Sequence, residues 1–123
     1  MSRLGWIVVA LALLEAGWLA FDGTRALVAG DYVTPRSGPY AGQLGPWSKV
    51  VARVGIEPRS TLMKSIHVGL GAAWLAVTLC FVLRMPWAWT GMLVCAVLGL
   101  WYLPFGTVLS VVQIVLLLVQ ARR

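Results

Sequence analysis

The chain has 123 residues, of which 60% are hydrophobic and 11% are charged, and its formal net charge is +6. This composition excludes an ordinary soluble domain, because long apolar segments fill most of the sequence. It also argues against a nucleic-acid-binding protein, because the basic residues stand beside the apolar segments, where they anchor membrane helices to lipid headgroups. We expect a single polytopic membrane domain over residues 1–123.

The first apolar segment covers about residues 4–21 and is long enough to cross a bilayer core, which needs about 17–25 residues. A signal peptide is the alternative because Arg3 precedes the run, but no small-residue cleavage site follows, so we expect the segment to be retained. Glu15 stands in its middle. A carboxylate at that depth costs about 2.5–3.5 kcal/mol, so such residues usually face a partner, a bundle interior or water.

Residues 22–60 form the long polar segment of the chain, and their Gly and Pro content predicts turns rather than a second domain. Within this loop, residues 46–54 predict a short amphipathic helix, with Pro46 in its first turn and Gly55 at its end. This interfacial helix either lies on the membrane surface or caps the bundle, and periodicity does not decide between the two. Its apolar side chains recur at i, i+3, i+4 and i+7: Trp47, Val50, Val51 and Val54.

The remaining apolar sequence divides into three spans, over about residues 61–83, 87–103 and 107–120. Arg84-Met85-Pro86 separates the first two, and Pro104-Phe105-Gly106 separates the last two. One long kinked helix is the alternative for the last pair, but without a break it would be about 50 Å long, against a hydrocarbon core of about 30 Å. The predicted fold class is therefore an all-α integral membrane protein, a four-transmembrane-helix bundle with a short amphipathic helix between helices 1 and 2.

Polar side chains on three of the predicted spans fall at compatible depths. We expect Glu15, His67 and Gln113 to form an intramembrane polar cluster, and Asp22 and Lys64 to form an ion pair at its mouth. Such a cluster suits hydrogen bonds that fix the register of the bundle, and it equally suits a site for a proton or an ion.

Small residues recur every four positions on two of the spans, which allows helix backbones to approach closely. The pattern leaves open whether the contact lies within the chain or between subunits. The helix-packing residues are Ala12, Ala16, Ala20, Gly91, Cys95 and Gly99.

Catalytic and metal-binding motifs are missing from the sequence: the single histidine excludes an HExxH site, and neither a GxSxG elbow nor a phosphate-binding glycine loop occurs. A haem held by His67 and by Met63 or another methionine is conceivable by residue type, but one histidine on a polar helical face is more typical of a hydrogen-bonded packing residue. We therefore predict that the protein is not an enzyme and has no catalytic residues, no metal and no cofactor.

A short four-span chain with a lone glutamate in its first span resembles the small multidrug resistance transporters. The resemblance is carried by Ala12-Leu13-Leu14-Glu15-Ala16 and by the number of spans. In that family the glutamate couples protons to cationic substrates, so the resemblance implies a similar role for Glu15. The chain departs from the family in its long first loop, in His67 and Lys64, and in its tight final hairpin.

The function we expect is that of an accessory or assembly component of a membrane complex, in contact with the lipid bilayer and with itself or a larger membrane protein. The alternative is a proton- or cation-coupled small transporter or channel that uses Glu15 and His67. Six of the ten basic residues lie at or near the long loop, which favours a cytoplasmic loop. Arg3 and the terminal Arg pair flank their spans more closely, and on that ground we predict cytoplasmic termini.

Overall fold

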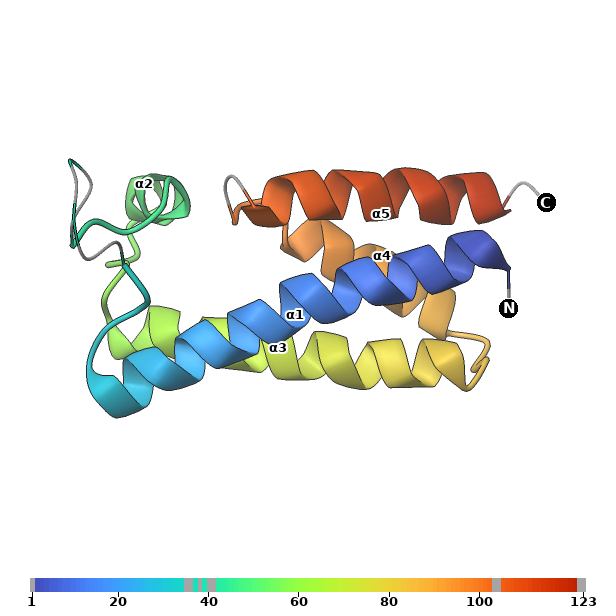
Figure 1. The fold of residues 1–123 in the computed structure, drawn as a ribbon, viewed down its shortest axis with the longest axis horizontal. Coiled ribbons are helices and arrows are strands. Elements are labelled where there is room, and N and C mark those ends of the chain that lie inside the picture. The colour runs from blue at the N-terminus through green and yellow to red at the C-terminus, as the bar shows by residue number, and fades with distance from the viewer. Residues whose placement is uncertain (1, 35–36, 38, 40–41, 103–104, 122–123) are drawn as a thin grey trace.

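The protein is described by a computed structural model that covers residues 2–34, 37, 39, 42–102 and 105–121. Among these residues the regular structure is entirely α-helical, without strands. Four helices lie side by side in a bundle, and a fifth, α2, lies beyond one end of it (Figure 1). The helices are α1 (Arg3–Ala29), α2 (Trp47–Arg53), α3 (Thr61–Val82), α4 (Ala88–Leu98) and α5 (Phe105–Ala121).

The four long helices form a closed ring in which α1 contacts α3 and α5, while α4 contacts α3 and α5. The chain runs up and down the bundle, so helices that follow one another in sequence lie next to each other in space (Figure 1). The two ends of the chain and the α3–α4 turn lie at one end of the bundle. The loop with α2 and the α4–α5 connection lie at the other.

α1 is longer than the sequence predicted, because it continues past residue 21 to Ala29. It begins at Ser2, whose Oγ accepts a hydrogen bond from the Gly5 backbone N–H at 3.1 Å. It ends at Gly30, which takes a left-handed conformation (φ 96°) that glycine adopts without steric cost. The loop was predicted to begin at Asp22, but Asp22 lies within α1, where its carboxylate accepts a hydrogen bond from the Val33 backbone N–H at 2.7 Å.

α3 agrees closely with the predicted span at 61–83. It begins after Ser60, whose Oγ accepts a hydrogen bond from the Met63 backbone N–H and caps the helix. α4 is shorter than the predicted span at 87–103 because the helix ends at Leu98, and turns follow up to Tyr102. The predicted break at Pro104 lies outside the described residues. α4 and α5 contact one another, so the alternative of one long kinked helix is wrong.

Two helices, α1 with 27 residues and α3 with 22, are long and apolar enough to cross a membrane. Their lengths correspond to about 40 Å and about 33 Å, at 1.5 Å per residue. α5 and α4, with 17 and 11 residues, are apolar but shorter.

Glycine allows the backbones of α1 and α3 to approach closely. A Cβ atom at Gly71 would lie 2.6 Å from the Ala20 backbone N and 2.8 Å from the Ala16 backbone O. The small residues on α1 therefore meet α3 within the chain, and Ala12 and Ala16 are fully buried. On α4, Cys95 is buried and Gly91 is half-buried; Gly99, directly after the helix, is buried.

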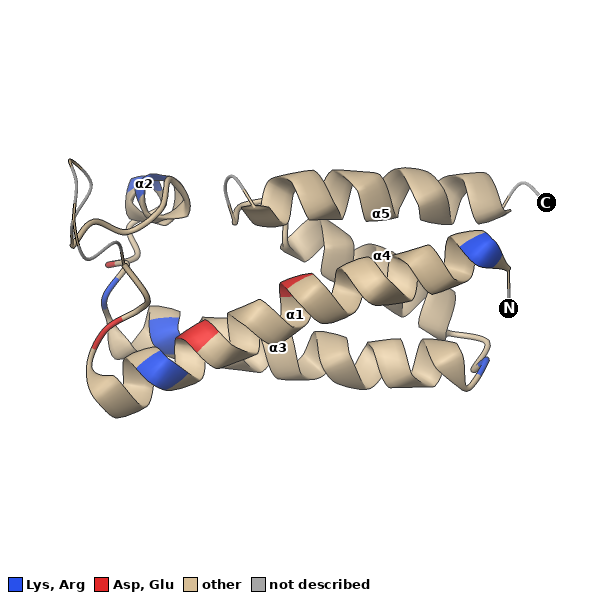
Figure 2. Ribbon diagram, in the orientation of Figure 1, with Lys and Arg blue, Asp and Glu red and all other residues tan. Residues whose placement is uncertain are grey.

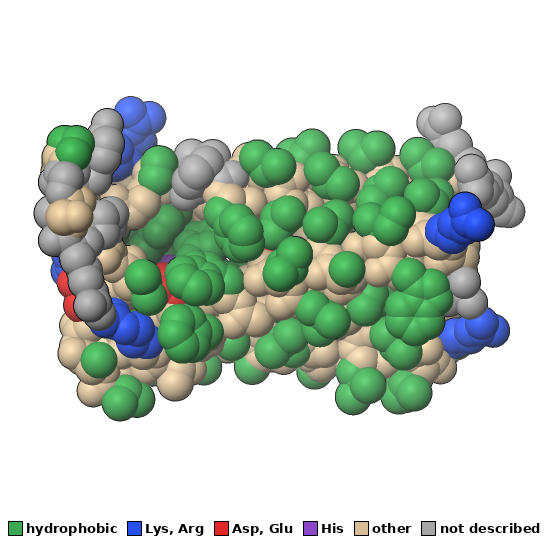
Figure 3. Space-filling view, viewed as in Figure 1, with side chains coloured by type: hydrophobic (Ala, Val, Ile, Leu, Met, Phe, Trp, Pro, Cys, Tyr) green, Lys and Arg blue, Asp and Glu red, His purple; other side chains and the backbone are tan. Residues whose placement is uncertain are grey.

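The outside of the bundle is apolar along its sides, and charged residues gather toward its ends (Figures 2 and 3). Large apolar side chains on every bundle helix face outward; Leu14, Leu79, Val97 and Val108 are each at least half exposed. The interior is apolar for the most part, but it also holds polar side chains, of which Glu15 and Gln113 are completely buried.

Candidate functional site

Glu15 connects α1 to α5 in the interior of the bundle. The Ser110 Oγ donates to the Glu15 carboxylate, at 2.9 Å from Oε2 and 3.1 Å from Oε1. The Gln113 Nε2 donates to Oε1 at 3.1 Å and also to the Leu109 backbone O at 3.1 Å. Both carboxylate oxygens thus accept hydrogen bonds from α5, and the structure places the predicted pair Glu15 and Gln113 in direct contact.

Two glycines make room for this carboxylate. A Cβ atom at Gly99 would lie 2.5 Å from the Glu15 Oε2, 2.8 Å from the Ser110 Oγ and 2.9 Å from Trp74 Cζ3. At Gly106 it would lie 2.8 Å from the same Oε2. Because any larger residue at either position would collide with the acid, the end of α4 and the start of α5 close around Glu15.

Ser110 and Gly106 were not among the predicted site residues. Ser110 stands three positions before Gln113 on the same face of α5, so helical spacing could have identified it as a second donor. Gly99 was predicted as a helix-packing residue, and nothing in the sequence pairs it or Gly106 with Glu15, because these contacts join distant segments.

His67 does not join this cluster, although the sequence predicted it there. Its Nδ1 lies 2.9 Å from the Met63 backbone O. A carbonyl oxygen only accepts, so Nδ1 donates, and Nε2 of the neutral ring is left as an acceptor. That Nε2 atom is buried and has no hydrogen-bond partner among the described residues.

Aromatic rings from three other segments surround the His67 imidazole. They come from the loop after α1, from α2, and from the turn after α4. The distances between ring centroids and the imidazole are 4.8 Å for Tyr32, 4.7 Å for Trp47, 5.3 Å for Trp101 and 5.5 Å for Tyr102. His67 is therefore the centre of an aromatic cluster that attaches the long loop and α2 to the bundle.

The predicted interfacial helix corresponds to α2, which the structure places at the end of the bundle. Trp47 and Val51 are buried, and Val50 is half-buried. Val54 follows the last helical residue and is 73% exposed, so it is not part of the buried face. Trp47 attaches α2 to the bundle through its contact with His67.

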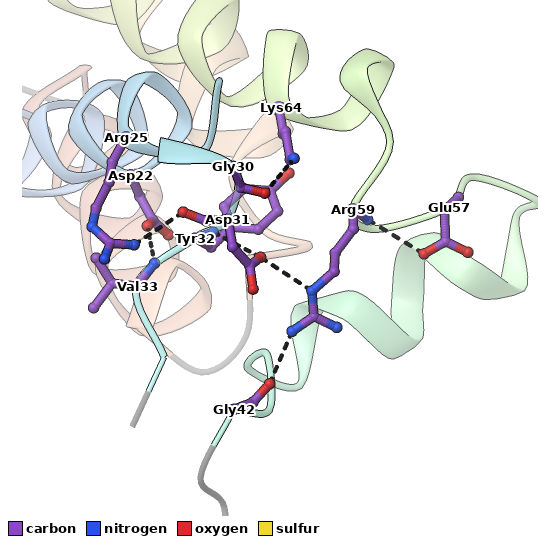
Figure 4. Close-up of polar contacts among 10 residues, drawn as sticks. All are labelled: Asp22, Arg25, Gly30, Asp31, Tyr32, Val33, Gly42, Glu57, Arg59 and Lys64. Carbon is purple, nitrogen blue, oxygen red and sulfur yellow. Dashed lines mark hydrogen bonds and ion pairs between the residues drawn. The ribbon is translucent and has the colours of Figure 1, made fainter. Parts of the chain in front are cut away.

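The predicted ion pair between Asp22 and Lys64 is not formed; each side chain contacts loop backbone instead (Figure 4). The Asp22 Oδ1 accepts from Val33 N, and the Lys64 Nζ donates to the Gly30 backbone O at 2.9 Å. Because α1 extends to Ala29, the segment that follows it supplies the backbone groups that the two side chains contact, Val33 N–H and Gly30 O.

The ion pair found among the described residues joins Arg59 to Asp31, with 3.1 Å between Nε and Oδ1 (Figure 4). Arg59 also donates to the Gly42 backbone O at 2.9 Å, so it links two parts of the long loop. Burial alone would raise the pKa of Asp31. Hydrogen bonds from Arg59 and the Tyr32 backbone N–H, together with the charges of Arg59 and Lys64, outweigh burial and lower this pKa below its ordinary value.

The arrangement around Glu15 can hold two helices together, and its acid can also carry a proton. Within the described part of the chain, Glu15 has no cationic partner, and no three His, Cys, Asp or Glu residues come together as metal ligands. Comparisons of the chain with protein-family models, with curated proteins and with solved structures find no match.

Proposed function

We propose that this chain is a small four-span membrane protein that acts without catalysis, as an accessory or assembly component of a membrane complex. The observation that supports it is the apolar outer surface of the bundle, together with the burial of a glutamate and a glutamine inside it. Glu15 and Gln113 are fully buried, whereas large apolar side chains cover the sides of the bundle. Soluble monomers rarely expose a contiguous apolar patch of more than about 300–600 Å². Lipid or partner helices would cover this surface.

The two shorter helices fit this proposal as spans because each lies against long neighbours. α5 measures about 25 Å, close to the thickness of a bilayer core. α4 measures about 16 Å, and the turns from Gly99 to Tyr102 continue it toward the loop end. Both contact a helix that is long enough to span, so we place all four in the same layer.

The surroundings of Glu15 favour a structural role over transport. Both of its oxygens accept hydrogen bonds, and glycines close around them. Hydrogen bonds between membrane helices contribute about 0.6 kcal/mol each, enough to select one register of the bundle. Because side chains fill the interior around Glu15, a partner would bind to the outer surface of the bundle. This partner is either a second copy of the chain or a larger membrane protein.

Transport of protons or cations is the second candidate, and the missing cationic partner of Glu15 favours it. A buried acid without a fixed counter-charge can exchange a proton when the bundle opens. His67 presents a second buried acceptor on α3. This candidate needs a conformation in which water reaches Glu15, since the residue is completely buried in the structure.

The near-isosteric substitution Glu15→Gln separates the two functions. An accessory protein keeps its membrane integration and its stoichiometric complex, measured by native mass after extraction in mild detergent. A transporter keeps its fold but loses proton flux into liposomes. Proton flux that depends on Glu15, in a preparation without any other protein, would contradict the accessory role.

The topology we propose places both termini in the cytoplasm. Ser2 and Gln120 lie at the same end of the bundle, where the Gln120 Nε2 donates to the Ser2 Oγ at 3.4 Å. Arg3 and Arg84 belong to this end; Arg122 and Arg123 lie outside the described residues. A reporter that is active only in the cytoplasm should be active at both termini, and a reporter active only outside should be silent.

A further inference from the structure

α2 lies across the end of the bundle rather than along it. The four bundle helices run across the view in Figure 1, whereas α2 is seen down its axis. Trp47, one of its two buried residues, contacts His67 of α3, so this side of α2 faces the bundle. A helix that lies across membrane-spanning helices runs in the plane of the membrane. α2 therefore has the orientation of an interfacial helix.

The opposite side of α2 carries two basic residues, Lys49 and Arg53. They are four positions apart, so they lie one helical turn from each other on the same face. Both are exposed. Figure 2 shows the basic positions of α2 on the side of the helix that is turned away from α1 and α3. Within the described part of the chain, neither residue forms an ion pair.

The acidic residues near this end of the bundle have other partners. Asp31 pairs with Arg59, and the Glu57 Oε1 accepts a hydrogen bond from the Arg59 backbone N–H at 3.4 Å (Figure 4). Asp22 is buried and accepts from the Val33 backbone N–H. The exposed face of α2 is therefore positively charged, which suits an anionic partner.

Aromatic side chains mark the level at which α2 lies. Trp18 and Phe21, in the loop half of α1, are 38% and 53% exposed, with 5.5 Å between their ring centroids. Exposed aromatic residues of this kind concentrate where a membrane meets water. Trp47 joins α2 to the same end of the bundle, because its ring lies 5.8 Å from that of Trp101. Long basic side chains at this level reach the phosphates of neighbouring lipids.

We propose that the exposed face of α2 docks on anionic phospholipids such as phosphatidylglycerol, with Lys49 and Arg53 against their phosphates. Charge complementarity selects this occupant, because phosphatidylcholine has the same phosphate but also a cation that cancels its charge. Each basic residue near an anionic surface strengthens such a contact by a factor of about five. α2 would then hold the long loop between the bundle and the lipid headgroups. The proposal rests on the membrane location proposed above.

The test is hydrogen–deuterium exchange of the full chain in lipid discs of phosphatidylcholine or of phosphatidylglycerol with identical acyl chains. Exchange of the α2 amides requires the helix to leave the membrane surface and open. We expect it to be about 25-fold slower in the glycerol lipid, the product of two such factors. In 1 M salt the difference should disappear, because the Debye length falls to about 3 Å. Equal exchange in both lipids at low salt overturns the proposal.

Lys49→Gln combined with Arg53→Gln removes both charges at exposed positions. In the choline lipid its α2 amides should exchange as in the wild type, and in the glycerol lipid they should not slow. Arg3→Gln combined with Arg84→Gln is the matched control, because it removes two exposed arginines from the opposite end of the bundle. This control should keep the slowing. Equal loss in both double variants, or full slowing in the first, overturns the role of α2.

The single variants Lys49→Gln and Arg53→Gln keep the test decisive if the double variant loses the helix. Each should retain about fivefold slowing in the glycerol lipid, since one of the two charges remains. Slowing that is unchanged in both single variants overturns the contact.

Two additions to the choline discs distinguish other sources of negative charge: an oligoglutamate peptide and inorganic phosphate. Neither should slow α2 as the glycerol lipid does. Slowing by the peptide but not by the lipid would assign the face to an acidic protein, and slowing by phosphate to the level of the lipid would assign it to a free anion. Either result overturns the proposal. Failure of the membrane location is distinguishable, because alkaline carbonate would release a protein that is not integral to membranes.

Discussion

The Glu15 Oε2 and the Gly99 Cα lie so close together that no Cβ atom fits between them without movement. Gly99→Ala should therefore destabilise the bundle by about 1–3 kcal/mol, the usual cost of inserting a methyl group into a filled interior. The measurement is the melting temperature in a fixed detergent.

Gly69→Ala is the matched control, because a Cβ there has no neighbour within 4 Å and the residue is exposed on α3. Replacing this helical glycine should stabilise the protein by about 0.4–1 kcal/mol. If both substitutions shift the melting temperature in the same direction by the same amount, Gly99 does not border the acid.

Pairwise coupling tests which side chains act together with Glu15. The effects of Glu15→Ala and Ser110→Ala on the unfolding free energy should be non-additive by about 0.5–3 kcal/mol. Either substitution alone already removes the hydrogen bond from the Ser110 Oγ to the Glu15 carboxylate, so the second has less left to remove. Glu15→Ala and His67→Ala should be additive, because His67 bonds to Met63 instead. The measurement is a double-mutant cycle of unfolding free energies, and the opposite pattern of coupling would place His67 beside Glu15.

The Asp31–Arg59 ion pair predicts a small dependence of stability on pH. Because folding lowers the pKa of Asp31, its contribution is fully present above the unfolded pKa of about 3.9 and is lost as pH falls through the folded value. Both side chains are more than 40% exposed, so screening limits the contribution to about 0.2–1 kcal/mol. Asp31→Asn should reduce the loss of unfolding free energy that the protein shows as the pH falls below 4. At pH 7 it should lower the unfolding free energy by no more than the contribution of the pair. If the dependence of the unfolding free energy on pH below 4 does not change, the ion pair does not contribute.

At the scale of helices, α2 is attached to the bundle by two buried side chains, Trp47 and Val51, of which Trp47 is the larger. Trp47 is buried against His67, Tyr32, Trp101 and Tyr102. Trp47→Ala should release α2 and raise the rate of proteolysis in the long loop at least tenfold, as the loss of roughly 3 kcal/mol of local burial implies. Val54→Ala, at a 73% exposed position, is the control and should leave the rate unchanged. Equal cleavage in both variants would mean that other contacts hold α2.

Helix ends were predictable from sequence where a local signal marks them. Ser60 caps α3 through its own hydroxyl, so the predicted start was accurate. The end of α1 was missed because Asp22 is polar, and its partner Val33 belongs to a later segment. The comparison of depths along the predicted spans correctly placed Glu15 beside Gln113. It does not fix the rotation of α3 about its axis, which decides where the His67 side chain points. Nor does it reveal that loop aromatic residues occupy the space around His67.

The sides of the whole molecule are apolar, and the clearest consequence concerns where a charge is tolerated. Leu14 is 59% exposed beside the buried Glu15, and Val28 is 84% exposed near the loop end of the same helix. In water, a lysine at either position would change stability by no more than about 0.5 kcal/mol, because surface substitutions are mostly neutral.

In a bilayer the two positions differ because of their depth. Leu14→Lys should cost about 2.5–3.5 kcal/mol and reduce the fraction of protein that resists carbonate extraction, since it places an ammonium group near the membrane centre. Val28→Lys should be tolerated, because its ammonium group can reach the headgroups. If both variants resist carbonate extraction equally and have equal melting temperatures, the apolar sides of the bundle are covered by something other than lipid.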